Sequence, residues 1–197
     1  GDGAAVHRGV RRFAQNSSRL GFDTENVAYI PPHVGVTRDR AAIVQLCGSN
    51  ERCYIFLVSK WPRYFDALRT LMSDALIEKV ALNVAGDVAR LAKRFDGAVV
   101  GGAVELRDSM SHLQVSGGSH TLQALTKVLL QEYVEKSVDH RAWEAPQLSR
   151  GQLVYAATDA WLHWRLDAKA HAMPPGPVGD GGGGGGGGGD GGGGVGE

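Results

Sequence analysis

The sequence predicts an α/β fold, in which a mixed sheet of five to six strands is flanked by helices. Two stretches rich in β-branched, apolar and aromatic residues, 41–47 and 53–58, are separated by turn residues and predict an antiparallel hairpin. Farther along the chain, short apolar strands alternate with segments whose apolar residues recur at helical spacing. Antiparallel strands followed by strand–helix alternation are typical of a layered fold with one mixed sheet.

The chain before and just after this hairpin supplies two helices, a strand and a loop. Residues 6–19 have the apolar spacing of an amphipathic helix, and residues 20–25 are predicted to form the first strand. Residues 26–40 contain two consecutive prolines and are predicted to be a loop. Pro62 is typical of a helix N-terminus, and apolar residues continue at helical spacing through Met72.

The second half of the chain is predicted to alternate between strands and helices. The expected elements are a strand at 79–83, a helix from 86, a strand at 99–106 and a helix at 122–129. Ser149 is a plausible N-cap for a last helix that continues through Leu166.

The chain of 197 residues is long enough for one domain with a full core. We expect residues 1–173 to form that domain. Residues 174–197, which are mostly glycine, are expected to be a disordered tail or linker, because glycine loses the most backbone freedom on folding and has no side chain to bury. This tail carries three of the 21 acidic residues and none of the 21 basic ones, so the rest has a net charge of +3, too small to identify a partner.

Cys47 and Cys53 flank the predicted hairpin turn at a spacing that is not typical of a zinc site. Free thiols are expected, as in an intracellular protein. No apolar run approaches the roughly 20 residues that a membrane-spanning helix needs, and no signal peptide is visible. The sequence therefore predicts an intracellular protein with no membrane partner, and its initial glycine suggests a fragment of a longer chain.

Asp23 and Glu25 follow the apolar start of the first predicted strand. Side chains alternate along a strand, so both carboxylates lie on the same face. Two buried carboxylates repel each other and lose hydration unless a divalent cation lies between them. The pair predicts either a metal site or, alternatively, a solvated strand end.

Three more residues complete a candidate constellation. Asp87 lies just inside a predicted helix N-terminus, where the helix dipole favours a carboxylate and where it can serve simply as a cap. Tyr155 and Asp159 are four residues apart on the last helix and therefore share a face. Each feature is common by itself, but Asp-x-Glu, a later Asp and Tyr-x-x-x-Asp together form a specific set.

This set resembles the four-carboxylate 3′–5′ exonucleases of the ribonuclease D and proofreading superfamily, which have a ribonuclease H-like fold. The matching motifs are Gly21-Phe-Asp-Thr-Glu25, Asn83-x-x-x-Asp87-x-x-x-Leu91 and Tyr155-Ala-Ala-Thr-Asp159. The tyrosine subclass (DEDDy) is indicated, because the histidine subclass has its histidine at the position of Val154. The segment 104–108 is most similar to the Werner syndrome exonuclease branch. Asn26 and Gln131 depart from the family pattern, and the strand that usually precedes the N-terminal helix is missing.

The resemblance implies a site for two Mg²⁺ or Mn²⁺ ions. Asp23 would contact both ions, Glu25 and Asp159 would complete the inner site, and Asp87 would help to hold the outer ion. Tyr155 would orient the attacking water, because a tyrosine with an ordinary pKa of about 10 is a poor general base at neutral pH.

The resulting hypothesis is a metal-dependent 3′–5′ exonuclease that releases nucleoside monophosphates from single-stranded or 3′-recessed nucleic acid, with DNA favoured over RNA. A nuclear location and possible further domains beyond the glycine tail belong to the same hypothesis. The alternative is an exonuclease-fold module with little or no hydrolytic activity, which serves as a nucleic-acid- or protein-binding platform in a larger protein.

For several other residues the sequence allows two interpretations. Some basic residues either contact backbone phosphates of a nucleic acid or are simply solvated. They are His7, Arg8, Arg11, Arg12, Arg19, Lys136, Arg141 and Arg150. Asp108 is either a fifth acid near the site or a surface residue. Phe22, Leu46 and Leu82 are expected in the core rather than stacked on bases.

Overall fold

The protein is described here by a computed structural model, which covers residues 8–10, 13, 17–26, 40–60, 66–97, 99–113, 121–135, 142–145 and 147–174. Three predicted features therefore lie outside the described residues: most of the loop (27–39), the helix start at Pro62, and the glycine-rich tail from residue 175.

A mixed sheet of five strands lies at the centre of the described fold, as the sequence predicts. The strands are β1 (Arg19–Asn26), β2 (Ala41–Cys47), β3 (Cys53–Phe56), β4 (Glu78–Ala81) and β5 (Ala103–Glu105), in the spatial order β3-β2-β1-β4-β5. The first three strands are antiparallel, and β4 and β5 continue the sheet in parallel with β1. β4 pairs with β1 only along Arg19–Gly21, so among the described strands the second half of β1 has a neighbour on one side only.

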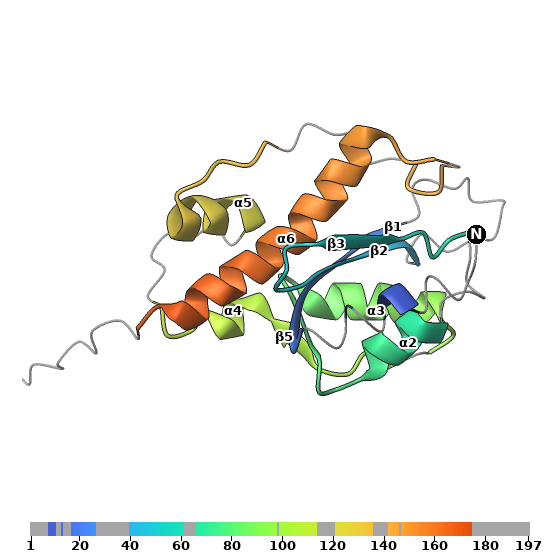
Figure 1. Cartoon of the computed structure of the whole chain (residues 1–197), viewed down its shortest axis with the longest axis horizontal. Coiled ribbons are helices and arrows are strands. Elements are labelled where there is room, and N and C mark those ends of the chain that lie inside the picture. The colour runs from blue at the N-terminus through green and yellow to red at the C-terminus, as the bar shows by residue number, and fades with distance from the viewer. Residues whose placement is uncertain are drawn as a thin grey trace, which may run out of the picture.

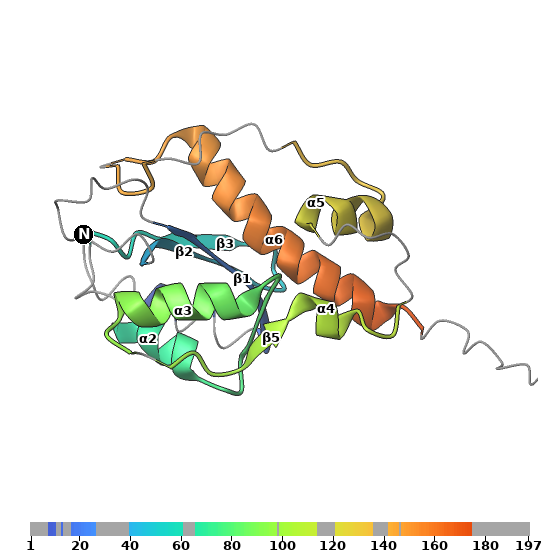
Figure 2. The ribbon, with the colours of Figure 1, turned by 180° about the vertical axis from the view of Figure 1, so that it is seen from behind.

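Helices cover both faces of this sheet (Figures 1 and 2). On one face lie α2 (Asp66–Ser73) and α3 (Val84–Arg94), and the long helix α6 (Arg150–Ala172) crosses the other. Beside α6 lie α4 (Leu106–Ser109), α5 (Leu122–Leu125) and the π-helix η3 (Thr126–Leu130).

The core follows the alternation of side chains along β1. Leu20 and Phe22 point to the α2–α3 face and are fully buried among residues such as Leu68 and Leu91. The intervening residues of β1 face α6 instead. The expected core positions are confirmed for Phe22 and Leu46, which are fully buried, and for Leu82, which packs against the cluster around α6.

The start of α6 is fixed by the predicted cap. The Ser149 hydroxyl accepts a hydrogen bond from the Gln152 amide at 3.1 Å, and the Gln152 side chain accepts one from the Ser149 amide at 2.9 Å. This reciprocal capping box satisfies two backbone donors that the helix itself leaves open. The cap therefore fixes the residue at which α6 begins.

Two predicted boundaries in the parallel half of the sheet are wrong. The predicted strand at 79–83 ends at Ala81, and α3 begins at Val84, two residues before the predicted start. The predicted strand at 99–106 is reduced to Ala103–Glu105. Gly102 has a φ of +63°, which is incompatible with extended backbone, and Leu106 already belongs to α4.

The N-terminal helix is shorter than its apolar spacing predicts. Residues 8–10 and 13 are helical, but Ser17 and Ser18 are not, and Arg19 opens β1. Arg19 is drawn into the sheet because its guanidinium pairs with Glu78 at 2.6 Å and with Asp167 at 3.3 Å. The positive charge of Arg19 is therefore paired with carboxylates of the fold and does not contribute to an N-terminal basic patch.

The predicted helix at 122–129 is also irregular. Only 122–125 are α-helical, and the chain then widens into η3, where the Thr126 hydroxyl donates a hydrogen bond to the Leu122 carbonyl at 2.7 Å. Gln131 ends the turn with a φ of +57°. Because the helical period changes, Val128 is exposed and does not join the core as its spacing predicts.

No helix among the described residues combines the length and the apolar character that crossing a membrane requires.

Candidate active site

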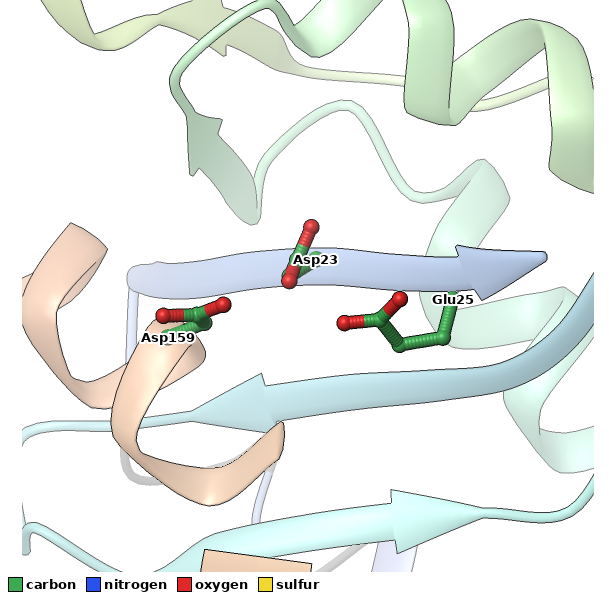
Figure 3. Close-up of side chains that lie close together, drawn as sticks. All are labelled: Asp23, Glu25 and Asp159. Carbon is green, nitrogen blue, oxygen red and sulfur yellow. The ribbon is translucent and has the colours of Figure 1, made fainter. Parts of the chain in front are cut away.

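Three of the predicted carboxylates meet above β1. Asp23 and Glu25 project from the same face of β1, and Asp159 reaches them from α6 (Figure 3). Each residue offers a carboxylate oxygen, and these oxygens lie within 4.8 Å of one another. The site thus joins two segments that lie far apart in the sequence.

The close approach of α6 to β1 depends on Gly21. A Cβ atom at this position would overlap the Ala160 carbonyl oxygen and would lie 2.6 Å from the Trp164 backbone nitrogen. Both atoms belong to the backbone of α6, so they cannot move aside as a flexible side chain does. The absence of a side chain at Gly21 therefore allows α6 to bring Asp159 next to Asp23.

Asp87 approaches the site from the first turn of α3. It is buried, and its Oδ1 atom accepts hydrogen bonds from the Thr24 hydroxyl at 2.6 Å and from the Arg90 guanidinium at 2.7 Å. Burial raises the pKa of Asp87 to about 6, and the bonds from Thr24 and Arg90 oppose that increase. Asp87 lies outside the group of three oxygens but close enough to repel Asp23 electrostatically.

The N-terminus of α3 is held by Glu105 of β5. The two Glu105 carboxylate oxygens accept hydrogen bonds from the backbone amides of Asn83 and Val84, each at 3.1 Å. Asn83 turns the chain into the helix with a φ of +64°. An anionic acceptor at a helix N-terminus satisfies open amides and complements the helix dipole. Glu105 thereby positions the turn that carries Asp87.

The negative charges of Asp23, Glu25, Asp87 and Asp159 lie close together, which favours the binding of a cation. The pKa of Asp23 lies well above its usual value, mainly because of burial and then because of the negative charges of Asp87, Asp159 and Glu25. A divalent cation among these oxygens would remove both the repulsion and the lost hydration. A donor set made only of carboxylate oxygens suits Mg²⁺ or Mn²⁺ better than zinc.

Tyr155 lies one helical turn before Asp159 and hydrogen-bonds to it. Burial and the charges of Asp159, Glu25 and Asp23 hold the pKa of Tyr155 above its usual range. The phenol therefore stays protonated at neutral pH and is suited to orient a water molecule rather than to remove its proton. Its ring packs against that of Trp143, with centroids 6.1 Å apart.

Gln45 is a candidate site residue that the sequence reasoning missed. It lies directly opposite Asp23 across the β1–β2 pair and is fully buried. Neither of its amide atoms has a hydrogen-bond partner among the residues that the structure describes. The signal was present in the sequence, because Gln45 is the one polar residue in the apolar stretch of 41–47.

The remaining candidates are exposed on the described part of the fold or lie outside the described residues. Asp108 is exposed on α4, which supports its reading as a surface acid. Arg150 is exposed at the first position of α6, and Arg8 is exposed near the N-terminus. Outside the described residues lie His7, Arg11, Arg12, Lys136 and Arg141.

Known 3′–5′ exonucleases are similar to this chain in sequence. A family model described as 3′–5′ exonuclease matches residues 8–171. The chain is similar to the bifunctional 3′–5′ exonuclease/ATP-dependent helicase WRN of Mus musculus, with 31% identity over 144 residues. The match covers 72% of this chain and 10% of that protein, so the chain spans about a tenth of the length of this relative.

Solved structures share the fold. Brucella melitensis NrnC bound to pGG has a TM-score of 0.64 and 25% identity, over 79% of this chain and 72% of that chain, and NrnC has also been solved with bound Mg²⁺. Trypanosoma brucei RNase D in complex with RNA U12 has a TM-score of 0.72 and 18% identity, over 90% of this chain and 63% of that chain. At this lower identity the likeness shows the fold alone.

Proposed function

Because the chain belongs to the 3′–5′ exonuclease domain family, we propose that it hydrolyses nucleic acid from the 3′ end with the help of two divalent cations. The predicted ribonuclease H-like fold, a five-stranded mixed sheet flanked by helices, is confirmed. The observation that carries the proposal is the meeting of Asp23, Glu25 and Asp159 within 4.8 Å, with Asp87 beside them.

The proposed roles follow from the positions of the side chains. Asp23, Glu25 and Asp159 would hold one cation, and Asp23 and Asp87 would hold the second. When bound, the cations would supply Lewis-acid stabilisation to the scissile phosphate and its leaving oxygen. The neutral Tyr155 phenol, hydrogen-bonded to Asp159, would orient the attacking water.

The substrate class is proposed from the family branch. The similarity to WRN and the branch-like segment 104–108 favour DNA over RNA, single-stranded or with a recessed 3′ end. The products would be nucleoside monophosphates. The same branch supports a nuclear location, which imaging of the fluorescently tagged protein would check.

The decisive experiment is release of mononucleotides from a 3′-recessed DNA duplex and from a matched RNA, with Mg²⁺, with Mn²⁺ and with chelator. We expect a metal-dependent ladder from the 3′ end, faster on DNA. Asp23→Asn should reduce turnover by more than the roughly 10–100-fold that is typical of an outer-shell partner of a metal. Asp108→Asn, which alters an exposed acid on α4, is the matched control and should leave turnover unchanged.

A different result would favour the alternative, in which the domain binds nucleic acid or protein but does not hydrolyse it. If folded protein binds the duplex but releases no product with either metal, the chain is a nucleic-acid-binding module and the hydrolytic proposal is wrong. If product forms equally well in chelator, or if Asp23→Asn keeps full activity without binding metal, the proposed use of the carboxylates is wrong.

A further inference from the structure

The β2–β3 turn places the two cysteines of the chain directly opposite each other. Cys47, the last residue of β2, is in register with Cys53, the first residue of β3, and both thiols are free. Opposed residues of antiparallel strands have Cα atoms about 4.5–5.5 Å apart. This separation falls within the roughly 4.4–6.8 Å that a disulfide spans. Their side chains also lie on the same face of the sheet.

The two thiols differ in access and in acidity. Cys47 is fully buried, whereas Cys53 is partly exposed. A hydrogen bond between the two thiols lowers the pKa of Cys53, and the same bond, together with burial, raises the pKa of Cys47. Cys53 is therefore the sulfur that a small oxidant can reach and that ionises more readily, and Cys47 is its shielded neighbour.

We propose that Cys47 and Cys53 form a hydroperoxide-reactive dithiol, which is oxidised to an intramolecular disulfide across the β2–β3 turn. The Cys53 thiolate attacks one oxygen of the hydroperoxide and breaks the O–O bond. This step gives a sulfenic acid on Cys53 and releases the other oxygen as an alcohol, or as water from hydrogen peroxide. The Cys47 sulfur then attacks the sulfenic sulfur, forms the S–S bond and releases water.

The cross-link would act on the turn and on its contact with α6. It closes the five-residue turn 48–52, whose backbone is already ordered by a hydrogen bond from the Glu51 amide to the Gly48 carbonyl at 2.9 Å. The Cys53 thiol also lies 3.4 Å from the Ala157 carbonyl, between Tyr155 and Asp159 on α6. Oxidation removes the thiol hydrogen that makes this contact. The modification itself does not depend on the proposed exonuclease activity.

The test uses the whole chain, fully reduced and then treated with an equimolar amount of hydrogen peroxide. Free thiols are alkylated, and peptides are mapped by mass spectrometry without reduction. We expect a peptide pair joined through Cys47 and Cys53 and lighter by two hydrogen atoms, which dithiothreitol reverses. Because a disulfide constrains the unfolded chain, the Tm of the oxidised protein should rise by several degrees, on the order of 5 °C.

Two single substitutions assign the roles. In Cys47→Ser, a sulfenic acid that dimedone traps should accumulate on Cys53, because no resolving thiol remains. In Cys53→Ser, Cys47 should stay unmodified under the same treatment. The proposal is overturned if both cysteines of folded wild-type protein remain fully alkylatable when peroxide has oxidised free glutathione in the same tube. It is also overturned if the disulfide joins two chains.

Discussion

Gln45 lies fully buried in the middle of β2, directly across from Asp23. A buried amide without partners destabilises a protein by about 1–3 kcal/mol. Carboxylates that bind metals are usually hydrogen-bonded by neighbours that fix their orientation. Gln45 and Asp23 share a face of the sheet, and the Gln45 amide makes no hydrogen bond within the described residues, so we predict that it orients the Asp23 carboxylate when a cation binds.

Replacing Gln45 with Leu should therefore separate stability from activity. We expect the free energy of unfolding of the metal-free protein to stay the same or to rise by about 1 kcal/mol, because the buried amide is removed. Turnover and Mn²⁺ affinity should fall roughly 10–100-fold. Urea unfolding, nuclease assays and calorimetric Mn²⁺ titration measure the three quantities. A loss of stability that parallels the loss of activity would instead assign Gln45 a purely structural role.

Among the contacts between secondary-structure elements, the packing of α6 on β1 depends on Gly21. In Gly21→Ala, the new Cβ overlaps the backbone of α6 at Ala160 and Trp164, so the helix must shift outward. Overpacking of this kind typically destabilises by about 1–3 kcal/mol. Because Asp159 moves with the helix, turnover should also fall sharply.

A glycine elsewhere in the chain provides the control for that change. Gly9 is helical, and a Cβ atom added there would meet no other atom within 4 Å, so Gly9→Ala should be neutral or slightly stabilising. Thermal unfolding and nuclease assays of the two variants make the comparison. Equal behaviour of Gly21→Ala and Gly9→Ala would contradict the close-approach argument.

Glu105 links β5 to the N-terminus of α3 and so to Asp87. In Glu105→Gln, one amide oxygen replaces two carboxylate oxygens, and the charge that complements the helix dipole is lost. We expect a loss of about 1 kcal/mol in unfolding free energy, as for other helix caps, and lower turnover because Asp87 is less well held. Asp108→Asn, on the exposed side of the neighbouring α4, should change neither quantity. An unchanged turnover in Glu105→Gln would show that Asp87 does not need this cap.

For the molecule as a whole, the raised pKa values of the acidic group make stability depend on pH, and a bound cation would change that dependence. Burial raises the folded-state pKa of Asp87 to about 6, above the unfolded value of about 3.9, and the pKa of Asp23 is raised as well. Between these values the folded protein binds more protons than the unfolded chain, so stability falls as pH rises. Asp87 alone accounts for about 3 kcal/mol, present below pH 4 and lost as pH rises through about 6.

A bound divalent cation should remove the loss of folding stability that occurs as the pH rises. In chelator, the unfolding free energy of wild type should fall from about pH 4.5 to about pH 7.5, and Asp87→Asn should weaken that dependence. With Mg²⁺ the wild-type protein should regain stability at the higher pH but not at the lower, because under the proposed function only the ionised carboxylates would bind the cation. Urea titrations at the two pH values measure these differences. Parallel pH dependence with and without Mg²⁺ would contradict the assignment of the acidic group to a metal site.

Local sequence patterns were enough to predict most of the elements, and the resemblance to the exonuclease family singled out the acidic residues as a set. Strand alternation places Asp23 and Glu25 on one face, helical spacing places Tyr155 with Asp159, and the Ser149 cap sets where α6 begins. These features depend on local geometry with fixed periods of two and 3.6 residues, so neighbouring residues are enough to predict them.

The folded molecule alone reveals which distant residues meet and how their environment changes them. The approach of α6 to β1 rests on the space left at Gly21, the cap on α3 comes from Glu105, and the full burial of Gln45 is a property of the folded chain. Local periods carry no information about such contacts, because crossing distances, burial and charge repulsion depend on segments far apart in the chain. The same reason explains why Arg19 was misplaced, since its partners Glu78 and Asp167 are distant in sequence.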